Sequence, residues 1–286
     1  MTNSRCIPSL VSLGSLLTLC LSLLAGCASG GGATGEGRGL DGIHTPTLSG
    51  GRDLRTASDE SNVRRRASIR LELAAAYYSQ QQYTIALDEI KKALAVDGNY
   101  SEAYEMRALI YDALNEPAYT DESYRKAIQL DSNNGSAMHN YAWWLCGRQQ
   151  YEPANALFER ASQMPRSVDS SKTLLAQGVC QQRAGKLLQA EQTLKRAFDL
   201  DPGSPATAFN LASVLFQKGE FDRARFYIRR VNNTPQLMTA ESLWLGVRVE
   251  HRLNNYRDRD DLAAVLRQRF SASREATALE LGRFDD

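Results

Sequence analysis

The sequence lacks an excess of charge of either sign. Its 286 residues include 34 Lys and Arg and 33 Asp and Glu, which gives a formal net charge of +1. A nearly neutral chain has no long-range field with which to attract a polyanion, so nucleic acid is not an expected partner. The basic run at residues 64–66 is typical of a solvated helix surface. No β-rich segment is present either, which favours a helical fold.

Residues that could form a catalytic or metal centre are few and scattered. Of the three histidines, His44 lies in a glycine-rich segment, and His139 and His251 lack a partner one helical turn away. Neither GxSxG nor HExxH occurs. Ser123 and Lys126 match SxxK, but the companion motifs SDN and KTG are missing. We therefore expect no enzyme activity, no metal, no cofactor and no small-molecule substrate.

Small residues recur along the chain with a period of about 34 residues. The pattern is most complete in residues 171–204, where Gly178, Ala190 and Ala197 mark close helix contacts, Gly185 a short loop and Pro202 a stop. Alanines occupy the equivalent places in other units: Ala74, Ala86, Ala93, Ala108, Ala127, Ala142, Ala154, Ala161, Ala212 and Ala224. Each unit is predicted to be a pair of helices. Tyr83, Tyr151 and Phe221 are expected to begin second helices and to fill the space between them.

This pattern resembles the tetratricopeptide repeat, with units at residues 67–100, 101–134, 135–168, 171–204 and 205–238 and a sixth from Thr239. The resemblance implies an all-α fold, a right-handed superhelical solenoid of about six repeats over residues 67–275. Residues 276–286 are expected to be a C-terminal tail. In the sixth unit, the charged residues 257–261 are expected to delay the start of the second helix.

The first residues are typical of an exported protein. Residues 1–26 have one positive charge followed by a leucine-rich stretch, which is the make-up of a signal peptide. Residues 24–27, Leu-Ala-Gly-Cys, resemble the lipobox of bacterial lipoproteins, in which the cysteine thiol receives a diacylglycerol. An ordinary cleaved signal or a short membrane helix is the alternative. The resemblance implies a lipid on Cys27 that holds the chain at the periplasmic face of the outer membrane. Glycine-rich residues 27–66 are expected to be a flexible tether.

Two cysteines remain after cleavage and lipidation. Cys146 and Cys180 fall in the first helices of adjacent repeats. Their different phases within the repeat favour two buried free thiols, because a disulfide has narrow geometric limits. A disulfide in an oxidising compartment is the alternative.

The first helices of such repeats are expected to line a concave groove that binds a partner. Apolar and aromatic side chains dominate the places predicted to face it, and buried aromatics contribute strongly to binding. The candidate groove residues are Leu71, Tyr78, Leu109, Trp143, Leu175, Val179, Phe209 and Phe216, and the same counting adds Ala75, Glu102, Glu105, Asp112, His139, Cys146, Lys172, Gln182, Ser213, Leu243 and Val247. The alternative is that several of them only pack between repeats. An apolar groove suits an amphipathic helix or an extended strand.

Further segments resemble the PilW/PilF family of type IV pilus biogenesis lipoproteins. They are residues 115–127, residues 140–152, and residues 241–248 together with residues 258–260. Members of that family act as pilotins, which bind the secretin subunit of the pilus machine and promote its localisation and assembly. The resemblance implies this function here, with the secretin and the outer membrane as partners. It also places important surface in the N-terminal repeats. A lipoprotein scaffold for outer-membrane protein assembly or for cell-wall enzymes is the alternative.

Overall fold

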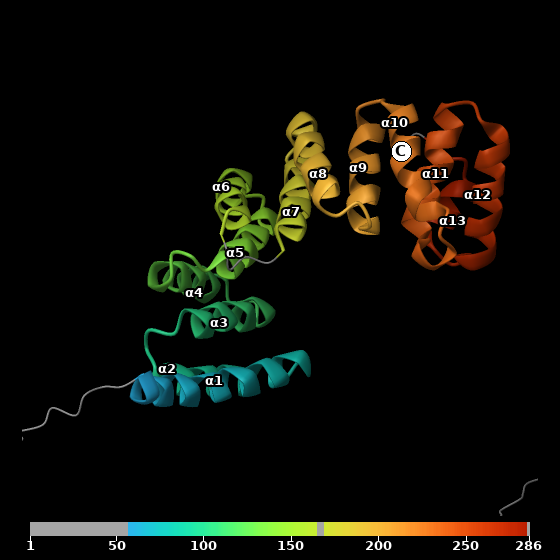
Figure 1. The fold of residues 1–286 in the computed structure, drawn as a ribbon. Coiled ribbons are helices and arrows are strands. Elements are labelled where there is room, and N and C mark those ends of the chain that lie inside the picture. Colours follow the sequence, from blue (N-terminus) through green and yellow to red (C-terminus); the bar gives the residue numbers. More distant parts are fainter. Residues whose placement is uncertain (1–56, 165–168, 285–286) are drawn as a thin grey trace, which may run out of the picture. The chain divides into compact units, whose positions relative to one another are not determined.

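The computed structural model describes residues 57–164 and 169–284, with side chains from Asn62 onward. These residues form α-helices and one 3-10 helix and contain no β-strand (Figure 1). The predicted signal peptide, Cys27 and most of the predicted tether lie outside them. The elements are α1 (Ala57–Ser79), α2 (Tyr83–Val96), α3 (Ser101–Ala113), α4 (Pro117–Leu130), α5 (Gly135–Gly147), α6 (Tyr151–Ser162), α7 (Ser170–Arg183), α8 (Leu187–Leu200), α9 (Pro205–Gln217), α10 (Phe221–Asn232), η1 (Pro235–Leu237), α11 (Ala240–Arg252), α12 (Tyr256–Arg269) and α13 (Arg274–Glu280).

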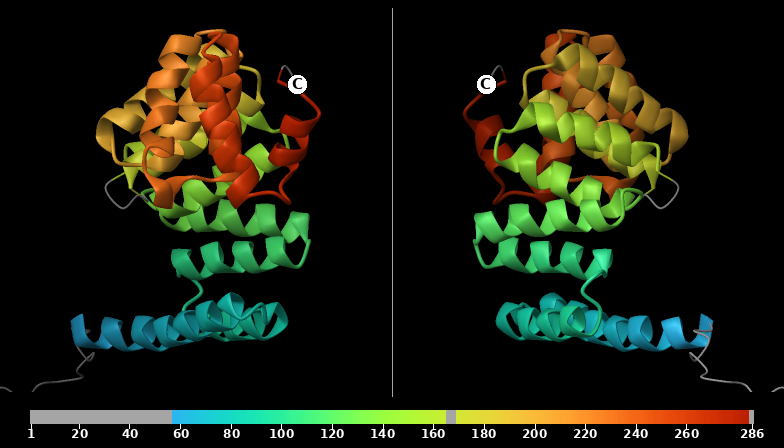
Figure 2. Two further views of the ribbon diagram at one scale, coloured as in Figure 1. Left: turned by 90° about the vertical axis from the view of Figure 1, so that its right-hand side faces the viewer. Right: turned by 90° about the vertical axis from the view of Figure 1, so that its left-hand side faces the viewer.

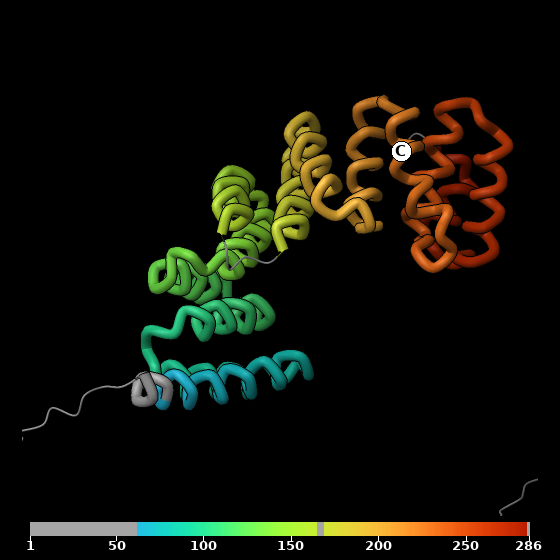
Figure 3. The backbone as a smooth tube through the Cα atoms, in the orientation of Figure 1, coloured from blue at the N-terminus to red at the C-terminus, as the bar shows by residue number. Residues whose placement is uncertain are grey.

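The helices form pairs whose boundaries match the repeat units predicted from the sequence. Each first helix contacts its second helix, and each second helix contacts the first helix of the next repeat. The tube of Figure 3 and the two views of Figure 2 show the pairs following one another in chain order. The prediction of an all-α tetratricopeptide-repeat solenoid is therefore confirmed. Tyr83, Tyr151 and Phe221 begin second helices as predicted, and each is half-buried.

One residue in every repeat adopts a left-handed backbone conformation, in the turn between the paired helices. The residues are Gln81, Asn115, Gln149, Gly185, Gly219 and Asn254. Glycine adopts this conformation without a steric penalty, whereas glutamine does so rarely. Glycine therefore identifies this turn in two repeats, and in the other four only the structure reveals it.

Small residues allow the paired helices to approach closely. A Cβ atom added to Gly178 in α7 would lie 2.5 Å from Cγ of Leu194 in α8, closer than real side chains come. In the first repeat Ala74 takes the place of Gly178 and Ala86 the place of Ala190, and both are fully buried. The recurring small residues are thus contact points between helices, as the period predicted.

The structure differs from the sequence prediction at both ends of the repeat region. Residues 57–66, which were assigned to the tether, belong to α1. Residues 274–280, mostly assigned to the tail, form α13, whose Ala276 and Leu279 join a buried cluster with α11 and α12. A short helix rich in polar residues carries too weak an apolar pattern to be recognised.

The sixth repeat also differs from its prediction. Its first helix is capped by Thr239 and begins at Ala240, one residue later than expected. Its second helix begins at Tyr256, so the charged residues 257–261 form the first turns of α12 and do not delay it. Charged side chains on the solvent side of a helix are compatible with helix formation, and their density alone was a poor guide to a boundary.

Among the described helices, none combines the length and the apolar character needed to span a bilayer.

Candidate partner-binding site

The predicted groove residues occupy the first helices and are mostly half-buried. Leu71 and Tyr78 pack against the core of the first repeat, and Leu109 packs against the core around α5 and α6. Leu175, Phe209 and Phe216 pack against the core formed by α8, α9 and α10, and Val179 is half-buried. Trp143 differs, because 41% of its surface is exposed. These side chains thus contribute to contacts between repeats and keep part of their surface available, and their role in partner binding stays a prediction.

Leu243 and Val247 do not line a groove. Both side chains are fully buried, in a cluster with Ala263 and Leu266. The one-residue shift of the sixth repeat explains the error, because on a helix a shift of one residue turns a side chain by about 100°. Counting from Ala240 places both residues where the other repeats carry core side chains.

Trp143 and Trp144 have different roles. The guanidinium of Arg183 lies 4.9 Å from the ring centroid of Trp143, so the two residues join α5 to α7 near the protein surface. The indole Nε1 of Trp144 donates a hydrogen bond to Oδ1 of Asp112 at 2.8 Å, and its ring stacks on Tyr141. Trp143 was predictable as a candidate from the sequence and Trp144 was not, although Trp144 forms a hydrogen bond to the preceding repeat. The available signal was the carboxylate of Asp112 in α3, the first helix of the preceding repeat, which can accept a hydrogen bond.

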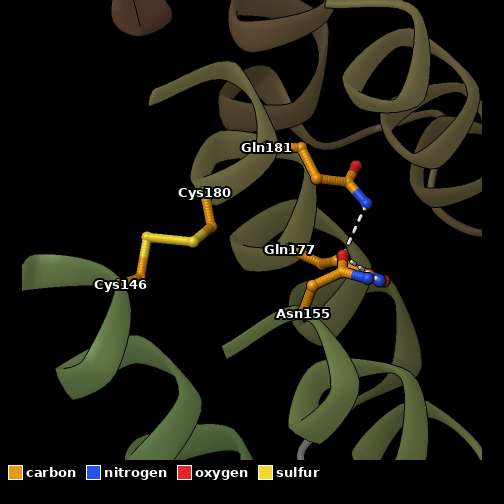
Figure 4. Close-up of a disulfide and its surroundings, with 5 residues drawn as sticks. All are labelled: Cys146, Asn155, Gln177, Cys180 and Gln181. Atoms are coloured by element: carbon orange, nitrogen blue, oxygen red, sulfur yellow. Dashed lines mark hydrogen bonds between the residues drawn. A yellow bond between two sulfur atoms is a disulfide. The ribbon is translucent and has the colours of Figure 1, made fainter. Parts of the chain in front are cut away.

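Consecutive first helices are bridged at one recurring place, near their C-terminal ends. Besides Asp112 with Trp144, Gln182 donates to Ser213 at 3.0 Å. The guanidinium of Arg248 lies 4.6 Å from the ring centroid of Phe216. At the junction between α5 and α7 the bridge is covalent, a disulfide between Cys146 and Cys180 with their Cα atoms 5.8 Å apart (Figure 4).

The expectation of two free thiols is therefore wrong. Different phases within the repeat do not prevent a disulfide, because each of these bridges joins different places in the two repeats. Cys146 is consequently not a groove residue, since it is buried in the disulfide.

The opposite side of α7 carries an amide cluster. Asn155 Oδ1 in α6 accepts hydrogen bonds from Gln177 at 3.0 Å and from Gln181 at 2.7 Å (Figure 4). Gln177 and Gln181 are both buried. The third and fourth repeats are thus held by a covalent bond and by a polar cluster.

At the second repeat the predicted groove is acidic, because its predicted lining there includes Glu102, Glu105 and Asp112. Glu105 accepts hydrogen bonds from Ser136 at 2.6 Å and from Asn140 at 2.8 Å, and Glu102 is exposed. The apolar groove residues gather instead on the first helix α1 and on α7 and α9. The predicted groove is therefore chemically uneven along the array.

Candidate chemical groups in the described residues are held in structural roles. Burial lowers the pKa of His139, whose Nδ1 lies 3.1 Å from Thr173 Oγ1 and whose ring meets Phe158 edge-on. Ser123 is fully buried; its hydroxyl donates to the Tyr119 carbonyl and accepts from Arg107. Within the described residues no cluster of His, Cys, Asp and Glu could hold a metal ion. These groups thus contribute to packing and hydrogen bonding between helices.

The first repeat leaves an apolar face uncovered. Ile69 is 55% exposed and Leu73 is 36% exposed. In the third repeat the equivalent residues, Ala137 and Tyr141, are buried against the preceding repeat. No described repeat precedes α1, and this face is left partly exposed within the described residues.

Comparisons with known proteins agree with this architecture. The tetratricopeptide repeat family matches residues 101–134 and 182–236. The type IV pilus assembly protein PilF of Pseudomonas aeruginosa is 28% identical over 195 residues, which is 68% of this chain and 75% of PilF. An uncharacterized protein of Haemophilus influenzae is 28% identical over 144 residues, which is 50% of this chain and 80% of that protein.

Solved structures extend the match. The crystal structure of PilW, described as a widely conserved type IV pilus biogenesis factor, has a TM-score of 0.67 and 28% identity, covering 74% of this chain and 97% of PilW. A structure of Pseudomonas aeruginosa PilF also has a TM-score of 0.67, with 24% identity, covering 77% of this chain and 99% of PilF. With the repeats, the sequence matches and these structures in agreement, the chain is a tetratricopeptide-repeat protein of the PilW/PilF type.

Proposed function

We propose that this protein is an outer-membrane lipoprotein that acts as a pilotin. It binds the secretin subunit of the type IV pilus and promotes the localisation and multimer assembly of that subunit. Support comes from the relatives, since PilF is named a type IV pilus assembly protein and PilW a type IV pilus biogenesis factor. Capture of a partner requires no reaction and no cofactor.

The observation that carries the binding role is the uncovered apolar face of α1. Ile69 and Leu73 occupy places that later repeats bury against the second helix of the preceding repeat. An amphipathic helix of a partner can take the place of that missing helix, which is a common mode of recognition. Exposed apolar surface of this kind marks interaction sites in soluble proteins. Leu71 and Tyr78 lie on the opposite side of the same helix, about 200° and 180° from Ile69, so they belong to the predicted groove and not to this face.

The proposed membrane anchor is a lipid attached to Cys27, in the residues before α1. A diacylglycerol on Cys27 would hold the repeats at the periplasmic face of the outer membrane, and further acyl chains make such anchoring durable. A captured secretin subunit would then travel with the lipoprotein. Binding would also cover aggregation-prone surface of the subunit until the multimer forms.

The test measures heat-resistant secretin multimers in outer-membrane fractions. We expect the multimers to disappear in a deletion strain and to be lost or mislocalised with Cys27→Ala. The double variant Ile69→Asp, Leu73→Asp should lose them while the protein stays folded and localised. Ile85→Asp is the matched control, because Ile85 is an exposed apolar residue on α2, away from this face.

Other outcomes decide against the proposal. Unchanged multimers in the deletion strain would show that the protein is not a pilotin. Co-purification with outer-membrane assembly factors or cell-wall enzymes would then favour the scaffold role. Equal loss in Ile85→Asp and in the double variant would show that α1 is not the specific surface.

A further inference from the structure

A cleft opens between the second helices of the second and third repeats. It has a volume of about 370 Å³, within the range of about 300–1,000 Å³ that is typical of ligand sites. We call it the basic cleft. Its lining residues are Arg125, Tyr141, Leu145, Gln150, Pro153, Ala156, Leu157 and Arg160.

The same place between the fifth and sixth repeats holds a second cleft, of about 260 Å³. We call it the acidic cleft. Its lining residues are Ile228, Arg229, Asn232, Asn233, Gly246, Glu250, Asp258, Asp261 and Leu262. Arg125 and Arg229 occupy the same place in their repeats, as do Leu157 and Leu262. The two clefts are therefore two versions of one structural position.

The two clefts differ in their carboxylates. In the acidic cleft, Arg229 donates to Glu250 at 3.0 Å and also pairs with Asp258. The residues that align with Glu250 and Asp258 in the basic cleft are Leu145 and Pro153. The chain thus supplies anions to Arg229 and places apolar groups at the corresponding points beside Arg125.

The charges of the basic cleft are only partly balanced. Arg125 pairs through Nε with Asp121 of its own helix at 2.7 Å, and 69% of its side chain is exposed. Tyr141 also donates to Asp121, and burial followed by this hydrogen bond raises the pKa of Tyr141 to about 12. Asp121 is therefore already engaged twice. Arg160 is exposed and forms no ion pair within the described residues.

The floor between these arginines is apolar. Leu145 is buried and Leu157 is half-buried, and both belong to the core around α5 and α6. An incoming apolar side chain would contact them, while a carboxylate beside it would meet two guanidinium groups. Arginine binds carboxylates with a planar pair of donors, which adds geometric specificity to the attraction.

We propose that the basic cleft binds a segment of a partner protein in which an acidic residue stands next to a bulky apolar side chain. The apolar side chain lies between Leu145 and Leu157, and the carboxylate meets Arg125 and Arg160. The carboxylate of the partner segment thus takes the place of the carboxylates that the acidic cleft receives from its own chain. This surface lies over second helices, so it is distinct from the uncovered face of α1 and does not depend on the pilotin role.

The experiment measures binding of a fluorescein-labelled peptide, Ser-Gly-Glu-Leu-Phe-Gly-Ser, to the full chain by fluorescence anisotropy. We expect saturable binding, at least tenfold tighter than binding of the peptide with Gln in place of Glu. Arg160→Glu should weaken binding at least tenfold. Arg196→Glu is the matched control, because Arg196 is the exposed equivalent of Arg160 in the next repeat and lines neither cleft. It should change the affinity less than twofold.

A second pair of variants tests the effect of giving the basic cleft a carboxylate that the acidic cleft has. Ala156 is exposed and aligns with Asp261, so Ala156→Asp adds the missing carboxylate without disturbing the core. We expect Ala156→Asp to weaken peptide binding at least tenfold and Ala156→Asn to leave it within threefold. The proposal is overturned if the wild-type chain does not bind the peptide, if Glu and Gln peptides bind equally, or if Arg196→Glu matches Arg160→Glu.

Discussion

Within the described residues, the two ends of the repeat array differ in how far the apolar face of the terminal repeat is covered. At the C-terminal end, α13 packs Ala276 and Leu279 onto Ala263 and Leu266, and all four side chains are buried. At the N-terminal end, α1 leaves Ile69 more than half exposed, with no described element against it. We refer to these regions as the closed end and the open end.

Repeat arrays normally need a polar surface at each terminal repeat, because every inner repeat buries its apolar face against a neighbour. The closed end meets this need with a short extra helix from the same chain. The open end does not meet it within the described residues. An end that keeps its apolar face available is suited to bind another protein, whereas a closed end contributes stability.

The largest expected effect concerns the disulfide that lies between the two ends. Cys146 and Cys180 enclose a loop with a sequence separation of 34. In the chain-entropy treatment, closing such a loop stabilises the fold by about 4 kcal/mol. The variant Cys146→Ala, Cys180→Ala should lose about that much free energy of unfolding in denaturant titrations followed by circular dichroism. Reductant should destabilise the wild type and leave the variant unchanged; equal sensitivity of both proteins would contradict the prediction.

At the closed end, Leu266→Ala should reduce the free energy of unfolding by about 3 kcal/mol, as expected for removing a fully buried leucine. Leu73→Ala at the open end should cost less than about 1 kcal/mol, because part of that side chain already contacts water. Denaturant titration of both variants measures the difference. Equal losses would mean that the open end is covered in solution by another part of the chain.

An ion pair joins the two helices of the open end in addition to their buried apolar contacts. Glu89 in α2 accepts hydrogen bonds from Lys92 at 2.6 Å and from Arg70 in α1 at 2.9 Å. The bond from Lys92 lowers the pKa of Glu89 below its ordinary value, and Arg70 adds to this, although burial opposes it.

A lowered pKa in the folded state has a defined consequence for stability. The contribution of Glu89 is fully present above its unfolded pKa of about 4.3 and is lost as the pH falls through the lower folded value. The melting-temperature difference between wild type and Glu89→Gln should therefore be constant from pH 7 to about pH 5 and shrink below about pH 4. A constant difference down to pH 3 would contradict the assignment.

The smallest effect on stability is expected for Ile69→Asp. Its side chain is largely in solvent, so the free energy of unfolding should change by no more than about 0.5 kcal/mol. Ala137→Asp at the equivalent place in the third repeat is the control, because a carboxylate there would be buried without a partner. Thermal unfolding of the two variants measures the contrast. Similar destabilisation by both would show that the face of α1 is buried.

Several features of the fold could be predicted from the sequence because local chemistry carries them. Gly178 and the alanines at equivalent places predicted the close helix contacts, and Tyr83 and Phe221 marked the starts of second helices. The predicted helix boundaries were wrong where the apolar pattern was weak, and the predicted groove residues were wrong where the repeat register was shifted by one residue. Residues 57–66 and 274–280 lack a clear apolar stripe, and the shift at Thr239 assigned Leu243 and Val247 to a groove although they form core.

The candidate site was predictable only in part. The sequence identified apolar places on the first helices, but it did not show which of them a neighbouring repeat covers. Trp143 and Trp144 are adjacent in the chain, and only packing distinguishes the partly exposed ring from the one bound to Asp112. The basic and acidic clefts join residues of two repeats, so neither is visible from one unit.

The sequence by itself determined the repeat period, the helical class and the places where helices approach, because each depends on residues close together in the chain. The tertiary structure decided the pairing of Cys146 with Cys180, the covering of the closed end by α13 and the exposure of Ile69. These features depend on which surfaces meet between repeats. A side chain at a given place in the repeat is buried or exposed according to the neighbour that packs on it, and that neighbour is fixed only when the whole array is assembled.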